Sequence, residues 1–241
     1  MKAIKCVNLT KCYKNLTAVD NLNLDVENGE LFALLGVNGA GKTTTIKMLS
    51  TLTQPTSGEA FLNGYSIIKE KQKVKEIIGV SPQETAIAPN LSVEENLDFI
   101  ASLYGFNKEK RRKKIEELTK TFSLESVLKR KAGKLSGGWQ RRVSIALSLI
   151  SEPEILFLDE PTLGLDIIAR NELWSFIESL KGKITIILTT HYLEEAEALS
   201  DRVAIMKDGK LIALGSAKEI KEKEGEESFE KAFIKLVGGR K

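Results

Sequence analysis

Residues 36–43 read Gly-Val-Asn-Gly-Ala-Gly-Lys-Thr and match the pattern G-x-x-x-x-G-K-[ST]. An apolar run that we predict to be a strand, Leu31 to Leu35, comes directly before them, and a predicted helix from about Lys42 to Leu52 follows. Glycines let the backbone turn sharply so that successive N–H groups point to one place, and the start of the helix adds partial positive charge. The segment therefore predicts a cradle for the phosphates of a nucleoside triphosphate.

Two side chains of this phosphate loop, defined here as residues 36–44, have predicted chemical roles. We expect Lys42 to reach the β- and γ-phosphates and the Thr43 hydroxyl to hold Mg²⁺. The alternative is a glycine-rich turn with a surface lysine, which chance produces in about one chain per hundred of this length. The predicted nucleotide contacts are Gly36, Asn38, Gly39, Ala40, Gly41, Lys42, Thr43 and Thr44.

Apolar runs alternate with helical patterns along much of the chain, which is typical of a parallel sheet. The predicted strands are Ala18 to Val26, Leu31 to Leu35, Ile77 to Val80, Ile155 to Leu158, Ile184 to Leu188 and Val203 to Met206. Asn63-Gly64 and Asp208-Gly209 are typical of hairpin turns. We therefore expect antiparallel strands beside the parallel ones.

The middle of the chain, Asn90 to Ser151, has helical patterns and no clear strand, and predicts a helical insertion. Its basic stretch, Lys108 to Lys114, is expected to be a solvated helix face, with contact to anionic lipid headgroups as the alternative. The tail from Ser216 to Lys241 is charged and helical in pattern. Its apolar stripe, spaced for packing on a core, consists of Phe229, Phe233 and Leu236.

Two carboxylates follow a predicted buried strand, because Asp159 and Glu160 come directly after Leu158. They should emerge at the carboxyl edge of the sheet, where α/β proteins bind ligands. We expect Asp159 to hold Mg²⁺ through its water shell and Glu160 to polarise the attacking water. The alternative is a polar helix start. His191 follows another predicted strand and is expected at the same edge, where it could bond the γ-phosphate and orient the water.

Composition limits the remaining classes of function. The 241 residues fit one α/β domain, and the formal charge of +3 predicts no strong footprint for a polyanion such as nucleic acid. The sequence is 42% hydrophobic and 29% charged, with no apolar run near the length of about 20 residues that crosses a bilayer. We expect the chain to stay in the cytoplasm, with Cys6 and Cys12 as reduced thiols.

With these residues in view, the chain resembles the nucleotide-binding subunits of ABC transporters from about Ile4 to Ser216. The most specific feature is Leu-Ser-Gly-Gly-Trp-Gln-Arg-Arg at residues 135–142, which is similar to the family's LSGGQ signature. Ser136, Gly137 and Gly138 at a helix start make a second anion site. The resemblance implies that this signature binds the γ-phosphate of ATP held by a partner subunit.

The resemblance also implies roles for three further residues. Tyr13 corresponds to the aromatic residue that stacks on adenine, with an ordinary half-buried strand tyrosine as the alternative. Gln83 corresponds to the Q-loop glutamine that touches Mg²⁺ and water, and Asp166 to the D-loop aspartate that communicates across the dimer. Two positions depart from the family pattern, since Trp139 replaces the usual Gln and Leu163 the frequent Ser. These departures leave the phosphate contacts unaffected and concern the coupling of the two halves.

The implied architecture is a P-loop NTPase, RecA-like, with an ATP-binding core of residues 1–83 and 152–215, a helical subdomain of 84–151 and a tail of 216–241. The implied cofactors are ATP and Mg²⁺. The implied partners are a second ATP-binding subunit, identical or related, and separate membrane permeases that dock near Gln83 and residues 84–104 on the inner face of the membrane. The exporter branch is the closest in look. An importer ATPase and a soluble ABC protein are the alternatives.

Overall fold

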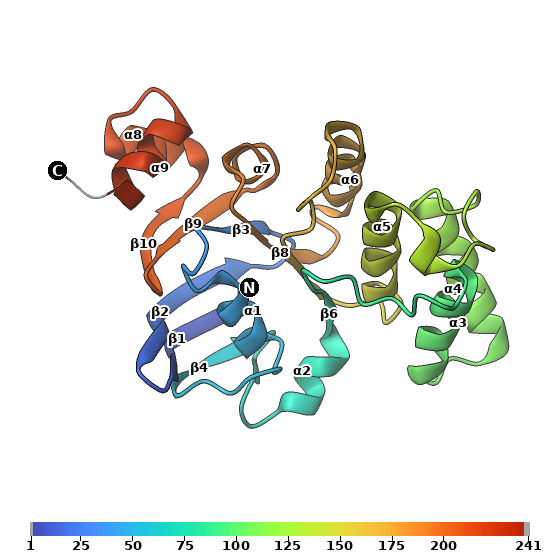
Figure 1. The fold of residues 1–241 in the computed structure, drawn as a ribbon. Helices are drawn as coiled ribbons and strands as arrows, with labels where there is room; N and C mark the ends of the chain where they lie inside the picture. The colour runs from blue at the N-terminus through green and yellow to red at the C-terminus, as the bar shows by residue number, and fades with distance from the viewer. Residues whose placement is uncertain (1, 239–241) are drawn as a thin grey trace. The chain divides into compact units, whose positions relative to one another are not determined.

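The computed structural model describes residues 2–238, and these divide into two compact units. The first unit combines the described parts of Met1–Glu76 and Lys181–Lys241. The second unit is Ile77–Leu180, and helix α2, Lys71–Ile77, leads the chain into it. Figure 1 shows the elements of each unit by label and chain colour.

The first unit contains an antiparallel sheet in the order β2-β1-β4-β5 (Figure 1). Its strands are β1 Lys2–Tyr13, β2 Leu16–Glu27, β4 Ser57–Leu62 and β5 Tyr65–Ser66. The predicted hairpin after Leu62 is confirmed, and both turn residues have positive φ, 45° at Asn63 and 86° at Gly64. Strand β1, which the sequence analysis did not identify, has several register shifts against β2.

The same unit contains the strands that carry the phosphate loop. Strand β3 (Leu31–Leu35) lies between and parallel to β8 (Thr185–Thr190) and β9 (Arg202–Lys207), and β10 (Lys210–Gly215) is antiparallel to β9. Every residue of β3 and β8 is buried, as a parallel strand covered on both faces requires. The bounds of β3 agree with the prediction. Helix α1, Lys42–Leu49, ends earlier than expected because Thr51 takes a left-handed φ of 61°.

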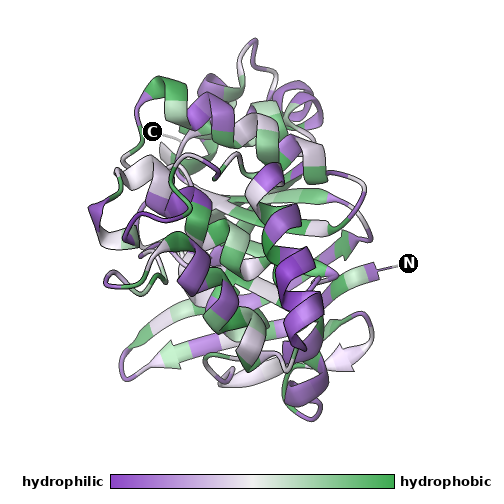
Figure 2. Ribbon diagram, turned by 90° about the vertical axis from the view of Figure 1, so that its right-hand side faces the viewer, coloured by the Kyte–Doolittle hydropathy of each residue, from purple (hydrophilic) through white to green (hydrophobic). Residues whose placement is uncertain are grey.

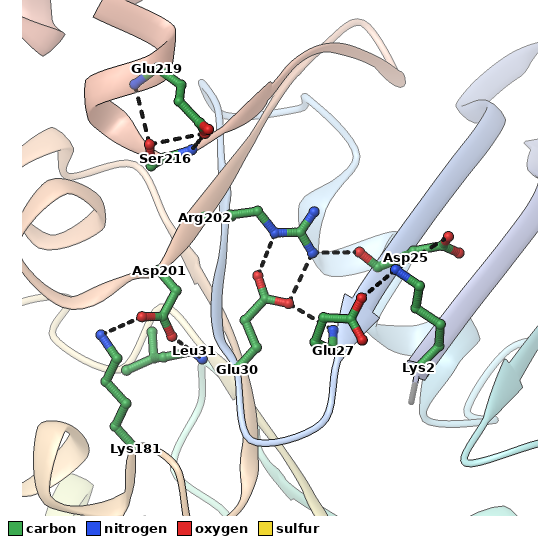
Figure 3. Close-up of polar contacts among 10 residues, drawn as sticks. All are labelled: Lys2, Asp25, Glu27, Glu30, Leu31, Lys181, Asp201, Arg202, Ser216 and Glu219. Carbon is green, nitrogen blue, oxygen red and sulfur yellow. Dashed lines mark hydrogen bonds and ion pairs between the residues drawn. The ribbon is translucent and has the colours of Figure 1, made fainter.

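A polar cluster fixes the start of β3 (Figure 3). Arg202 on β9 donates from Nε and Nη2 to the two carboxylate oxygens of Glu30, at 2.7 and 2.9 Å, and from Nη2 to the carbonyl of Asp25 at 2.8 Å. Asp201 accepts from the backbone N–H of Leu31 at 3.0 Å and pairs with Lys181. The strand that leads into the phosphate loop is thus held at its first residues.

The C-terminal part of the first unit is helical, as predicted, but in two pieces. Helix α8 spans Ala217–Glu224 and α9 spans Phe229–Gly238, with Gly225 between them at a φ of 68°. Ser216 and Glu219 form a capping box at the start of α8 (Figure 3). The predicted apolar stripe packs on a core cluster with β3, β9 and α7 (Leu193–Leu199). Residues 239–241 of the expected tail lie outside the described residues.

The second unit pairs two parallel strands with several helices. Strand β6 (Ile78–Ser81) pairs with β7 (Ile155–Asp159). The helices are α3 Val93–Leu103, α4 Lys108–Thr121, a 3-10 turn at Ala132–Lys134, α5 Gly137–Ser148 and α6 Ile167–Leu180. Within residues 90–151 the only strand-like pairing is an isolated bridge, Ser92 to Lys131, so the predicted helical insertion is confirmed. In Figure 2 the helices are banded in purple and green, the pattern of amphipathic helices.

The basic stretch on α4 is engaged in ion pairs with neighbouring carboxylates. Arg111 pairs with Asp98 at 3.0 Å, and Lys114 pairs with Glu117 and Glu152 at 3.0 and 3.2 Å. This pairing favours a solvated helix face over a surface for anionic lipid. Among residues 2–238, no helix combines the length and the apolar character needed to traverse a bilayer.

Candidate functional site

The phosphate loop connects β3 to α1 in the first unit, and its backbone permits only glycine at two positions. Gly41 has a φ of 104°, and a Cβ there would come 2.5 Å from the carbonyl oxygen of Ala18. A Cβ at Gly36 would come 2.5 Å from the carbonyl oxygen of Met206. Both obstacles are backbone atoms, which cannot rotate away. The glycines that the sequence pattern selects are therefore required by this packing.

Lys42 lies inside the curve of the loop and is only 5% exposed. Its ammonium donates to the carbonyls of Gly36 at 2.7 Å and Val37 at 3.2 Å. A buried cation at the start of a helix, surrounded by backbone groups, is a strong site for an anion. Asn38 and Gly39 are exposed at the tip, and Thr43 and Thr44 are half-buried in the first turn of α1.

The hairpin turn between β9 and β10 braces this loop. Gly209 donates its N–H to the carbonyl of Ala40 at 3.2 Å and accepts from the N–H of Asp20 at 2.8 Å. The turn has positive φ at Asp208 (49°) and Gly209 (78°), which confirms the predicted hairpin. The loop is therefore held by segments that are distant from it in sequence.

His191 emerges beside the phosphate loop within the first unit. Leu35, the last residue of β3, is in register with Thr190, the last residue of β8, so Gly36 and His191 leave the sheet at the same edge. The residue is half-buried, and the centre of its ring lies 4.2 Å from that of Tyr192, with the two rings tilted by 39°. The structure thus brings His191 to the edge where the sequence predicted it.

Tyr13 is the last residue of β1 and is 42% exposed. The ammonium of Lys11 lies 4.9 Å from the centre of its ring, and the same ammonium donates to the carbonyl of Gln54 at 2.7 Å. An exposed ring at a strand end has a face available for stacking, and it is not a core residue of the sheet.

The carboxylates lie in the second unit at the end of β7. Asp159 and Glu160 are 5% and 8% exposed, and Glu160 has a left-handed φ of 48°. Ser81 on β6 is in register with Leu158 on β7, so Gln83 and the two carboxylates follow neighbouring strand ends. Left-handed backbone in a residue other than glycine is uncommon and concentrates at functional sites.

Arg141 on α5 belongs to the signature segment. The sequence predicts no role for it, but the structure shows that it binds the backbone around Gln83. It is 5% exposed and donates to the carbonyl of Pro82 at 2.6 Å and to that of Gln83. Burial lowers the pKa of its guanidinium, and the negative charge of Asp159 opposes that shift. Nothing local in the sequence indicates these contacts, because the acceptors lie 58 and 59 residues away.

The signature segment begins α5, with Ser136 as N-cap. Ser136 and Gly137 are exposed, and the Ser136 side chain makes no capping hydrogen bond. A Cβ at Gly138 would lie 3.2 Å from the Cβ of Ala169 on α6, so the two helices approach closely there. Asp166 accepts from the N–H of Ala169 at 2.9 Å and caps α6.

The two departures from the family pattern have different surroundings. The Trp139 ring lies 4.9 Å from the guanidinium of Arg142, which also pairs with Glu172 on α6. Leu163 is 36% exposed. Trp139 therefore contacts a residue of its own helix that pairs with α6, whereas Leu163 is a surface residue.

The donor groups of the site suit ATP and Mg²⁺. The loop combines a buried ammonium with backbone too crowded for any Cβ at Gly36 and Gly41, and phosphate oxygens are the natural ligand of such a cradle. Within the first unit, the hydroxyl of Thr43 is an oxygen donor of the kind that Mg²⁺ prefers; within the second unit, the carboxylate of Asp159 is another. These features define the class: the chain is a P-loop nucleoside triphosphatase domain.

Comparison with known proteins gives the family. The model of the ABC transporter family matches residues 19–163. A solved ATP-binding subunit of an ABC transporter superposes over 97% of this chain and 99% of its own, with a TM-score of 0.87 and 29% identity. A dimeric ATP-binding cassette, MJ0796, solved after hydrolysis with ADP and phosphate, matches 88% of the chain and 98% of its own with a TM-score of 0.81 and 29% identity. The chain belongs to the ABC transporter family and is an ATP-binding ATPase domain of that family.

Curated relatives have names from drug efflux. The doxorubicin resistance ATP-binding protein DrrA of Mycobacterium tuberculosis is 44% identical over 88% of this chain. The probable multidrug ABC transporter ATP-binding protein YbhF of Escherichia coli is 38% identical over 97% of it. The chain spans 64% of the length of DrrA and 41% of that of YbhF. The names agree with the predicted exporter branch.

Proposed function

We propose that this chain binds and hydrolyses ATP to drive transport by separate membrane-spanning permease subunits. The observation that carries the proposal is the phosphate loop, in which Lys42 is buried against the carbonyls of Gly36 and Val37. Burying a cation costs free energy, and here hydrogen bonds to two carbonyls offset part of the lost hydration, which a bound phosphate would offset further. The names of two relatives, a doxorubicin resistance protein and a probable multidrug transporter protein, favour export of drugs.

Each residue of the proposed site has its own chemical task. Lys42 and the loop N–H groups neutralise the β- and γ-phosphates, and Tyr13 stacks on the adenine. Thr43, Gln83 and Asp159 would hold Mg²⁺, which would neutralise charge on the transferred phosphoryl group.

Glu160 accepts the proton of the attacking water. His191 orients that water and bonds the γ-phosphate. Glu160 is 8% exposed, so its carboxylate is largely shielded from bulk water.

A second copy of the chain, or a related cassette, completes each site. Ser136, Gly137 and Gly138 of one subunit bind the γ-phosphate of ATP that the other subunit holds, and Asp166 contacts the facing subunit. The exposure of Ser136 and Gly137 supports this role, because their polar groups lie on the surface of the second unit. ATP binds the closed dimer better than the separate subunits, so binding drives closure and hydrolysis reverses it.

The permease surface is proposed on residues 84–104 of the second unit. Phe99, Leu103 and Tyr104 on and after α3 are 50%, 67% and 49% exposed. Such a group of large apolar side chains on one short helix is typical of a binding surface for another protein. Through this contact the chain is held at the inner face of the membrane.

The decisive experiment is Glu160→Gln with Mg-ATP. The variant retains the phosphate loop and cannot accept the proton, so we expect ATP to bind without turnover and to trap a dimer that elutes early in size-exclusion chromatography. ADP is the control, because it lacks the γ-phosphate that joins the subunits. Turnover at the wild-type rate in this variant contradicts the assignment of the base, and a monomer with saturating Mg-ATP contradicts the shared site.

A further inference from the structure

Helix α5 lies along strand β6 and the segment that follows it. Arg141 bonds the carbonyls of Pro82 and Gln83, and the hydroxyl of Ser144 lies 3.2 Å from that of Ser81. One helical turn further, a Cβ at Gly79 would come 2.2 Å from the carbonyl oxygen of Ser148. Positions 141, 144 and 148 lie on one face of the helix. As α5 runs from residue 141 to residue 148, the contacts of this face therefore move back along the chain from Gln83 to Gly79.

Gln83 is held by its backbone while its side chain faces outward. The guanidinium of Arg141 donates from its two terminal nitrogens to two consecutive carbonyls, at 2.6 Å to that of Pro82 and also to that of Gln83, and its planar fork fixes the directions of both bonds. The residue Gln83 is exposed. The side-chain amide of Gln83 is thus exposed to solvent, while its backbone carbonyl is held by Arg141.

The far end of the same segment is also tied to a helix. Asn96 on α3, which is 2% exposed, accepts from the N–H of Ala88 at 2.7 Å and donates to its carbonyl at 3.1 Å. Between these two anchors, Glu84 and Ala86 are exposed. The segment of residues 82–88, called here the 82–88 strap, is therefore suspended between α5 and α3.

An adjacent side of α5 contacts α6. Gly138 approaches Ala169 closely, and Arg142 pairs with Glu172. The signature helix thus contacts the 82–88 strap with one face and, with an adjacent face, the helix that Asp166 caps.

We propose that Arg141 is a positioning residue that joins the 82–88 strap to the signature helix, so that Gln83 and Ser136 move together. The proposal rests on the proposed function, in which Gln83 acts on Mg²⁺ and Ser136 on the γ-phosphate. A displacement of the strap by a docked permease then reaches both groups at once. If Arg141 only satisfies the backbone hydrogen-bond acceptors of a turn, its replacement should lower stability without these specific effects.

The test compares Arg141→Met, Arg141→Lys and the wild type, with Arg142→Met as the matched control on the same helix. Hydrogen exchange of a peptide covering the 82–88 strap is measured in the nucleotide-free protein, and kcat and KM for ATP are measured with Mg²⁺. We expect Arg141→Met to speed exchange of the strap at least about tenfold and to lower kcat about tenfold to a hundredfold, as for other residues that orient metal ligands. The KM for ATP should stay within about twofold, because the phosphate loop is built from other residues.

Arg141→Lys keeps one of the two bonds and should recover part of both effects. Arg142→Met should leave exchange of the strap unchanged. Unchanged exchange in Arg141→Met, or a kcat reduced only in proportion to the loss of folded protein, overturns the proposal. The exchange measurement requires no hydrolysis, so failure of the proposed function, seen as no ATPase activity in the wild type, is distinguishable from failure of this inference.

Discussion

Two helices of this chain begin at glycine-rich turns, and the two turns are built differently. The turn before α1 is closed, because Gly36 is buried, Gly41 fits against the backbone of Ala18, and Lys42 lies inside it. The turn before α5 is open, with Ser136 and Gly137 exposed and no side-chain cap.

This difference indicates which of the two helix N-termini can bind phosphate without a second subunit. The turn before α1 has a cation, Lys42, bonded within its own loop, whereas the cations in the second turn of α5, Arg141 and Arg142, bond Gln83 and Glu172 outside the glycine-rich turn. A helix start with free N–H groups alone attracts an anion weakly, by about 0.3–1 kcal/mol at an exposed site. The open turn therefore needs a phosphate that is already held elsewhere, and the nucleotide of a second subunit meets that need.

The largest expected effect is at the closed turn. Lys42→Ala removes charged hydrogen bonds to phosphate worth about 1.5–3 kcal/mol, so affinity for ATP should fall roughly tenfold to a hundredfold. Titration with a fluorescent ATP analogue measures it. Lys47→Ala, an exposed lysine in the last turn of the same helix, is the control and should bind normally. Equal affinities for wild type and Lys42→Ala would remove the closed turn from the binding site.

Gly41→Ala and Gly137→Ala compare the two turns directly. At Gly41 the positive φ and the Ala18 carbonyl oppose a Cβ, so we expect a loss of about 1–3 kcal/mol in unfolding free energy, and weaker ATP binding. At Gly137 no atom lies within 4 Å of a Cβ, and alanine is favoured over glycine in a helix by up to about 1 kcal/mol. Urea unfolding measures both. A stable Gly41→Ala protein would show that the closed turn is more tolerant than its geometry indicates.

The smallest effect concerns the cap of the open turn. Ser136→Ala should change the free energy of unfolding by less than about 0.5 kcal/mol, because the hydroxyl caps no N–H, and should still lower ATP turnover. Ser92→Ala at the start of α3 is the matched control. There the hydroxyl accepts from Glu95 in a capping box, and its loss should cost about 1 kcal/mol. Equal destabilisation by the two changes would mean that Ser136 serves its helix and not a ligand.

Local signals made much of this architecture predictable. The bounds of β3 followed from an uninterrupted apolar run ending at a glycine-rich turn, and both hairpins followed from Asn-Gly and Asp-Gly pairs that take positive φ. Strand β1 was not recognisable, since register shifts and a left-handed Asn8 interrupt its alternation. Within the candidate site, the phosphate loop and His191 could be placed from the ends of strands. The role of Arg141 could not, because its acceptors are separated from it by most of the helical segment.

The two Asx-Gly turns look alike in sequence but are not equivalent for protein engineering. Gly64 is exposed, and no atom lies within 4 Å of a Cβ placed there, so an epitope tag or a fluorophore inserted at that turn has room. Gly209 is buried and bonded to both Ala40 and Asp20. A tag inserted at that second turn would disturb the phosphate loop and therefore nucleotide binding, although Gly209 lies 169 positions after Ala40 in the sequence.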